Sequence, residues 1–254
     1  MNRFPPQLRI ALLLGAAAVL ATAALFPYLL ALKPGALTLA AAAYGLPPAA
    51  VIALQSLQSG VIYFLLAWAG LKLGAPLGLE AGWLGAWLYG RPRPHASNWL
   101  LAALLGALCA GAILGAIALF GTPLDRPAVA ARDPAPWRGL LASPYGAIVE
   151  ETGLRVFAMG CIAWLLARIT AGVPRTWTML AAIVLAALLF GVGHLPLAAQ
   201  LGPLTVAVIA RVVSYKAFAG LVFGALYWKR GLEHAMLAHF CADLGLHVVA
   251  PAIT

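Results

Sequence analysis

Charge is what this sequence most lacks, and negative charge above all. Only 9% of the 254 residues are charged, with 7 Asp or Glu against 16 Lys or Arg. Soluble domains carry roughly 25% charged residues, so the composition excludes an ordinary soluble protein. Hydrophobic residues make up 64% of the chain, and its mean hydropathy is +0.97. We therefore predict a polytopic membrane protein.

Cysteine is also scarce, and basic residues do not cluster. Cys109, Cys161 and Cys241 lie in apolar segments without metal-like spacing, so small buried residues are the simplest interpretation. The net charge of +9 is spread over the loops and forms no basic block. This distribution indicates membrane topology and contact with membrane lipids, and it implies no nucleic-acid partner.

Long apolar runs are abundant. A transmembrane helix needs about 20 apolar residues, and seven segments meet this length with short loops between them. An eighth span could come from the regions around Leu37 or Trp83, although the stretch 72–98 suits a helix along the interface. We predict an all-α membrane helix bundle of about seven to eight spans, forming a single integral-membrane domain over residues 1–254. The seven segments are 8–32, 48–70, 99–120, 144–167, 177–198, 203–228 and 232–250.

The basic residues also predict the orientation of the chain. If the N-terminus is cytoplasmic, nine Lys or Arg fall on the inside and four on the outside, as the positive-inside rule requires. We therefore expect a cell-membrane protein with its N-terminus inside, in keeping with a bacterial inner membrane.

Charge inside the fourth apolar segment is the exception to the general pattern. Glu150, Glu151 and Arg155 fall within six residues, although an ionisable side chain at bilayer depth costs at least ~2.5 to 3.5 kcal/mol. On a helix, Glu151 and Arg155 share a face and can pair, while Glu150 lies about 100° round the axis. The pair could be structural or catalytic.

Two later segments carry further polar residues at membrane depth. His194 follows two glycines at the end of the fifth segment, and His239 and Asp243 share a helical face in the seventh. We predict that these three residues converge with Glu150. A Glu and a His can deprotonate water, and a second His with a protonated carboxyl can stabilise an oxyanion. The set indicates a hydrolase without a nucleophilic Ser or Cys.

Other polar residues have simpler interpretations. His234 is expected at the interface, and His247 as a hydrogen-bonded core histidine. Arg211 and Lys216 could neutralise Asp243, or could contact a peptide C-terminus or a lipid phosphate; the counter-ion role is favoured.

The motifs together resemble those of the CPBP family of intramembrane proteases, which includes the type II CAAX prenyl endopeptidases. The resemblance covers about residues 143–249, and rests on Glu150-Glu151-x-x-x-Arg155, Phe190-x-x-x-His194 and His239-x-x-x-Asp243. It implies a metal-independent glutamate protease without a cofactor. Glu150 and His194 would then activate water, His239 and Asp243 would form the oxyanion site, and Arg155 would pair with Glu151.

The final motif residue differs from that of the prenyl proteases, which carry Asn where this chain and other family members carry Asp. An ionised Asp cannot donate to an oxyanion. Asp243 must therefore be protonated, or must orient His239 instead.

The resemblance leaves the substrate and two alternative functions open. The substrate is expected to be a prenylated C-terminal tail or another membrane-associated peptide or protein. A zinc hydrolase could use Glu150, His194 and His239 as ligands, but no His-Glu-x-x-His sequence is present. A membrane scaffold or immunity protein would keep the fold without catalysis.

Overall fold

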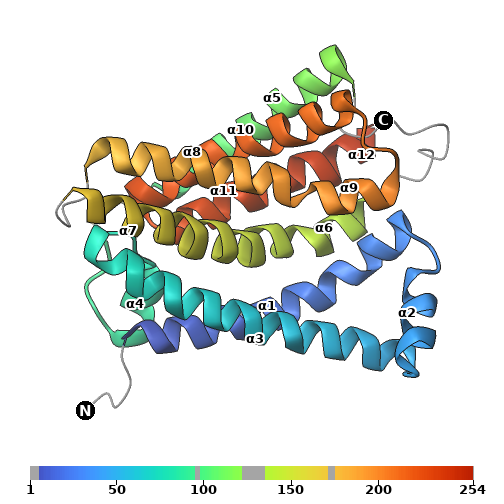
Figure 1. Ribbon diagram of the computed structural model, residues 1–254, viewed down its shortest axis with the longest axis horizontal. Helices are drawn as coiled ribbons and strands as arrows, with labels where there is room; N and C mark the ends of the chain where they lie inside the picture. The colour runs from blue at the N-terminus through green and yellow to red at the C-terminus, as the bar shows by residue number, and fades with distance from the viewer. Residues whose placement is uncertain (1–5, 95–97, 122–134, 171–174, 254) are drawn as a thin grey trace.

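Seven long apolar helices dominate the computed structural model, which describes residues 6–94, 98–121, 135–170 and 175–253. They lie side by side, with the two chain ends at opposite ends of the bundle (Figure 1). The predicted all-α membrane bundle is confirmed. Six spans are built on α1 (Pro6–Leu32), α3 (Pro48–Gly74), α5 (Trp99–Phe120), α8 (Thr176–Gly193) with α9 (Leu195–Leu201), α10 (Val206–Arg230), and α11 (Leu232–Leu244) with η5 (Gly245–Val249) and α12 (Ala250–Ile253).

The two regions considered for an eighth span form only short helices. Helix α2 (Ala36–Tyr44) has 9 residues and α4 (Gly82–Tyr89) has 8. A helix of this length rises less than half of the roughly 30 Å hydrocarbon core. Within the described ranges, the structure therefore contains seven candidate spans.

The fourth span begins earlier than the predicted start at residue 144. It comprises α6 (Pro136–Pro144), the π-helical segments η3 (Tyr145–Glu150) and η4 (Thr152–Met159), and α7 (Gly160–Ile169). Proline is favoured in the first turn of a helix, and Pro136 starts α6. Residues 136–143 are therefore helical, although the sequence placed them in the connection between two spans. Pro144 lies inside the helix and cannot donate an N–H, and hydrogen bonding continues beyond it in the wider π pattern.

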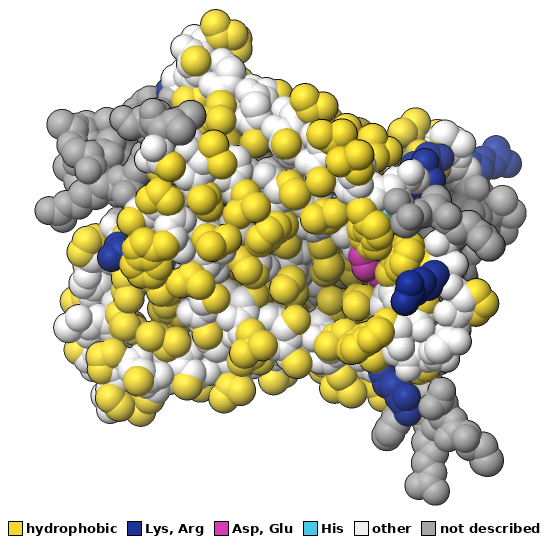
Figure 2. All heavy atoms as spheres, turned by 180° about the vertical axis from the view of Figure 1, so that it is seen from behind, with side chains coloured by type: hydrophobic (Ala, Val, Ile, Leu, Met, Phe, Trp, Pro, Cys, Tyr) yellow, Lys and Arg dark blue, Asp and Glu magenta, His cyan; other side chains and the backbone are white. Residues whose placement is uncertain are grey.

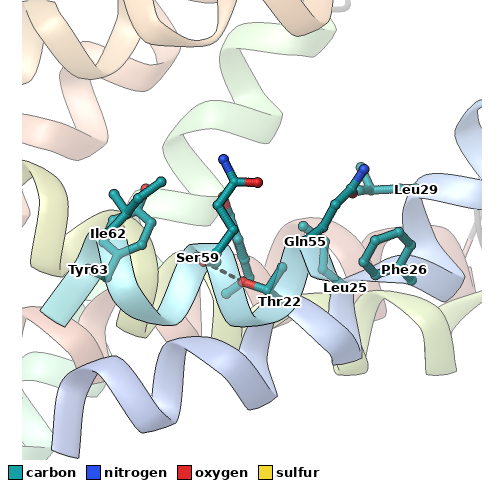
Figure 3. Close-up of a pocket in the computed structure, with 10 residues that line it drawn as sticks. Thr22, Leu25, Phe26, Leu29, Gln55, Ser59, Ile62 and Tyr63 are labelled. Atoms are coloured by element: carbon teal, nitrogen blue, oxygen red, sulfur yellow. Dashed lines mark hydrogen bonds between the residues drawn. The ribbon is translucent and has the colours of Figure 1, made fainter. Parts of the chain in front are cut away.

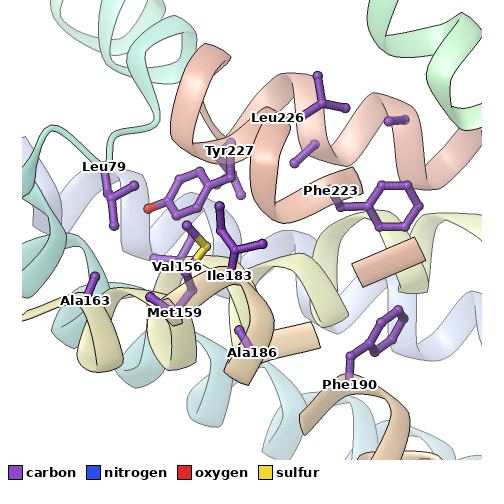
Figure 4. Packing of buried hydrophobic residues seen from close by; sticks show 14 of the residues in the cluster. Leu79, Val156, Met159, Ala163, Ile183, Ala186, Phe190, Phe223, Leu226 and Tyr227 are labelled. Atoms are coloured by element: carbon purple, nitrogen blue, oxygen red, sulfur yellow. The ribbon is translucent and has the colours of Figure 1, made fainter. Parts of the chain in front are cut away.

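This fourth span is the centre of the bundle. Its successive segments contact α1, α3, α8, α10 and α11. Val156 and Met159 of this span belong to the main apolar cluster together with Ile183 of α8 and Phe223 of α10 (Figure 4). Polar residues on the fourth span are therefore surrounded by other helices and kept away from lipid.

The outer surface is that of a membrane protein. Large side chains such as Leu20, Leu108 and Leu119 are exposed. On the face in Figure 2, hydrophobic side chains cover the middle, and the visible Lys and Arg lie towards the two ends. Because the helices run between these ends, the apolar band has the arrangement expected for contact with lipid tails.

Close helix packing depends on one of the three glycines of α5. A Cβ on Gly106 would collide with the backbone carbonyl of Ala238 in α11, whereas Gly111 and Gly115 have no neighbouring atom within 4 Å of such a Cβ. The small-residue contact expected between membrane helices is therefore made at Gly106.

We predict that Gly106→Ala lowers the thermal unfolding temperature of the detergent-purified protein, because α5 must move away from α11. Overpacking of this kind costs roughly 1–3 kcal/mol. Gly111→Ala is the matched control on the same helix and should leave the unfolding temperature unchanged or slightly higher. Equal behaviour of the two variants would contradict the α5–α11 contact.

Candidate active site

A fully buried ion pair lies at the base of the candidate site. Arg155 Nε is 3.2 Å from Glu151 Oε2, and the two side chains are 1% and 0% exposed. Arg155 also donates to the Gly220 carbonyl of α10 at 3.3 Å, and its guanidinium lies over the rings of Phe190 and Phe223. Such enclosure gives the pair no access to a substrate and fits a structural role.

Glu151 also holds His239, a contact that the sequence did not reveal. His239 Nδ1 lies 2.8 Å from Glu151 Oε1, although the two residues are 88 positions apart. Because a carboxylate only accepts hydrogen bonds, Nδ1 is the donor here. This bond, with the stacking of Phe223 on the ring at 4.6 Å, directs His239 Nε2 towards Glu150.

Glu150 lies between two imidazole rings. Its Oε1 is 3.6 Å from His194 Nε2, and its Oε2 is 3.6 Å from His239 Nε2. The side chains of Glu150 and His194 are 21% and 20% exposed. His194 Nδ1 lies 2.9 Å from the Phe190 carbonyl and therefore donates to it. Adjacent carboxylates thus differ sharply, because Glu150 is accessible and Glu151 is enclosed.

Asp243 completes the predicted group and has a second histidine beside it. Its Oδ2 is 3.8 Å from His239 Nε2, and its Oδ1 is 3.9 Å from His247 Nε2. His247 Nδ1 is in turn 3.1 Å from the Tyr28 hydroxyl of α1. His247, which we expected to be a core histidine, is hydrogen-bonded but also lies next to the site. The spacing of four residues between Asp243 and His247 could have indicated from the sequence that the two side chains share a helical face.

Gly146 forms the floor beneath these side chains. A Cβ at this position would lie 2.8 Å from His239 Nε2 and closer still to Asp243 Oδ2. A glycine in η3 therefore lets α11 approach the fourth span closely enough for the polar groups to meet. Sequence reasoning did not single out this residue.

A pocket lies between α1 and α3 (Figure 3), and Tyr145 of η3 is also part of its lining. It has a volume of about 360 Å³. Tyr63 and Tyr145 both line it, and Tyr145 lies on the same π-helical segment as Glu150. Six polar and four apolar residues line the pocket, namely Thr22, Gln55, Gln58, Ser59, Tyr63 and Tyr145 with Leu25, Phe26, Leu29 and Ile62.

A metal ion would need several ligand atoms arranged around one point. Zinc requires ligand atoms at about 2.0–2.2 Å from one point. Among the residues that the structure describes, no three His, Cys, Asp or Glu side chains are arranged to hold a metal together.

Comparison with protein families matches residues 132–245 to the family described as type II CAAX prenyl endopeptidase Rce1-like. The matched residues make up less than half of the 254-residue chain. No curated protein and no solved structure gives a significant match. The resemblance inferred from the motifs is confirmed, and the match supports a membrane protease within a multi-pass membrane protein. The matched range contains all six residues predicted for the site and its support.

We predict that Arg155→Met destabilises the protein by roughly 3 to 5 kcal/mol, because Glu151 is left as a buried, uncompensated charge. Thermal unfolding in detergent measures the effect. The double variant Glu151→Gln/Arg155→Met, which removes both charges, should recover part of the loss. If the double variant is no more stable than the single one, the pair is not the source of the effect.

We further predict that Gly146→Ala reduces peptidase activity at least tenfold while the protein still folds, because the new methyl group displaces His239 and Asp243. Gly193→Ala is the control beside His194, since nothing lies within 4 Å of its Cβ. Initial rates with a fluorogenic peptide check both variants. Full activity of Gly146→Ala would contradict the close approach of Gly146 to His239 and Asp243.

Proposed function

We propose that the protein is an intramembrane endopeptidase of the cell membrane that hydrolyses a peptide bond near the C-terminus of a prenylated or other membrane-associated peptide. Water activated by Glu150 and His194 would attack the bond without a metal ion or cofactor. The observation that carries the proposal is the accessible carboxylate of Glu150 between the Nε2 atoms of two histidines. The family of residues 132–245 supports the same class of reaction.

Water activation follows from the hydrogen bonding of His194. Since Nδ1 donates to the Phe190 carbonyl, the neutral ring has an acceptor at Nε2, which faces Glu150. A water molecule donating to both Nε2 and the Glu150 carboxylate would direct an oxygen lone pair at a peptide carbonyl. Glu150 would take one proton as the oxygen attacks, and then pass it to the leaving amine.

His239 is suited to stabilising the resulting oxyanion. Its Nδ1–H is used by Glu151, so donation from Nε2 requires the imidazolium form, in which both nitrogens carry protons. The carboxylates of Glu150, Glu151 and Asp243 all lie within 4 Å of this ring and would stabilise its positive charge. The oxyanion would then receive a charge-assisted hydrogen bond.

For Asp243 the contacts favour orientation over donation. The carboxylate lies between His239 and His247, with one oxygen towards each ring. His247 can donate to it and the positive charge of the His239 imidazolium attracts it, so an ionised Asp243 would be held in place and would help to fix the His239 ring. Of the two roles open to this residue, we therefore propose positioning.

The pocket between α1 and α3 supports a peptide substrate. An extended peptide in a membrane needs partners for its backbone N–H and C=O groups. Gln55, Gln58 and Ser59 supply such groups among apolar neighbours, and Tyr63 and Tyr145 continue the polar lining towards Glu150. We propose that substrate approaches along this side, with the N-terminus of the enzyme in the cytoplasm.

The test is cleavage of a quenched fluorescent farnesylated C-terminal peptide, and of its unprenylated twin, by the purified protein in liposomes. We predict that Glu150→Gln lowers kcat by about 10²- to 10⁴-fold, the usual contribution of a general base. Glu80→Gln, a matched change outside the bundle core, should retain the wild-type rate.

EDTA distinguishes the alternatives. Activity that survives chelation and is lost in Glu150→Gln supports the metal-free mechanism, and the twin peptide reports whether the prenyl group is needed. Activity lost with EDTA and restored by zinc would overturn that mechanism in favour of a zinc hydrolase. Equal rates for Glu150→Gln and wild type would exclude Glu150 as the base.

A further inference from the structure

Lys216 is a cation near the middle of a membrane span. It is the eleventh of the 25 residues of α10, and no carboxylate of the described residues lies within 4.0 Å of its ammonium. Lysine at this depth is expensive and usually marks a substrate or ion pathway. The counter-ion role expected for Lys216 is therefore not realised as a direct ion pair with Asp243.

The ammonium lies next to the candidate active site. Lys216 Nζ is 5.4 Å from the ring centroid of Phe190, and that centroid is 4.9 Å from the His194 ring and 5.7 Å from the His239 ring. The ammonium and the His194 ring therefore cannot be farther apart than the sum of two of these distances, about 10 Å. Lys216 also interacts electrostatically with Glu150 and His194.

The other charges of the site have nearer partners. Glu151 is paired with Arg155, and the carboxylates of Glu150 and Asp243 face histidines. Among the described residues near the site, Lys216 is thus a cation without a carboxylate within 4.0 Å. A lipid phosphate is a poor candidate, because ten residues of α10 before Lys216 correspond to about 15 Å of helix, which puts the ammonium far from a headgroup.

We propose that Lys216 binds the free carboxylate at the C-terminus of the peptide substrate. This inference rests on the proposed function and deepens it by defining one end of the substrate. The ammonium lies no more than about 10 Å from the His194 ring, and three extended residues span at most about 10 Å, so a carboxylate on Lys216 leaves room for only a few residues between it and the site. Lys216 would therefore align a bond close to the C-terminus with Glu150.

The experiment compares two peptides that differ only in ending with a free carboxylate or a carboxamide. Both are tested on wild type and on Lys216→Gln in liposomes. The wild type should cleave the acid at least tenfold more efficiently in kcat/KM, mainly through a lower KM. Lys216→Gln should lose this preference because its rate falls much more with the acid than with the amide, and Lys216→Arg should keep part of it.

The matched control is Lys229→Gln on the same helix, where the ammonium lies over Trp228 at the helix end; it should keep the preference for the acid. If wild type cleaves both peptides equally, or if Lys216→Gln slows both by the same factor, Lys216 does not recognise the carboxylate although the protease function stands. If wild type cleaves neither peptide, nor the farnesylated substrate, the proposed function itself fails, and this inference fails with it.

Discussion

The buried guanidinium of Arg155 is the constraint on which the site depends. A charge at this depth is tolerated only if it is compensated, and its partners are Glu151 on the same span and the Gly220 carbonyl on α10. Glu151 in turn fixes a ring nitrogen of His239 on α11. One enclosed charge therefore sets the relative positions of three spans. The distances around Glu150 follow from that arrangement.

Backbone proximity is the second requirement, because short polar side chains meet only where helices nearly touch. Gly146 leaves room for His239 and Asp243, Gly106 lets α5 contact α11, and Gly70 of α3 packs against the Val156 carbonyl. The interior of this bundle is accordingly rich in alanine and glycine, as expected where lipid supplies no hydrophobic driving force between helices. Large apolar residues lie mainly on the outside.

Sequence reasoning captured what depends on local pattern. Long apolar runs identified the seven spans, and spacing of four identified Glu151 with Arg155 and His239 with Asp243. The convergence of Glu150 with His194 was also correctly predicted, because polar residues in membrane helices face one another. The early start at Pro136, the bond from Glu151 to His239, and the floor at Gly146 depend on how separate spans are packed. No spacing within a single segment encodes them.

The contrast between Glu150 and Glu151 gives the strongest physical argument about function. The two carboxylates are adjacent in the chain, yet Glu151 is fully buried and paired with Arg155. Glu150 is partly exposed and lies between the imidazole rings of two histidines. A network with only a structural role would not benefit from the exposure of Glu150, because a buried carboxylate is better protected from the lipid. The exposure of Glu150 therefore supports the proposal that water and a substrate reach this carboxylate. The same reasoning supports the proposal for Lys216, a mid-membrane cation whose ammonium has no carboxylate of the described residues within 4.0 Å.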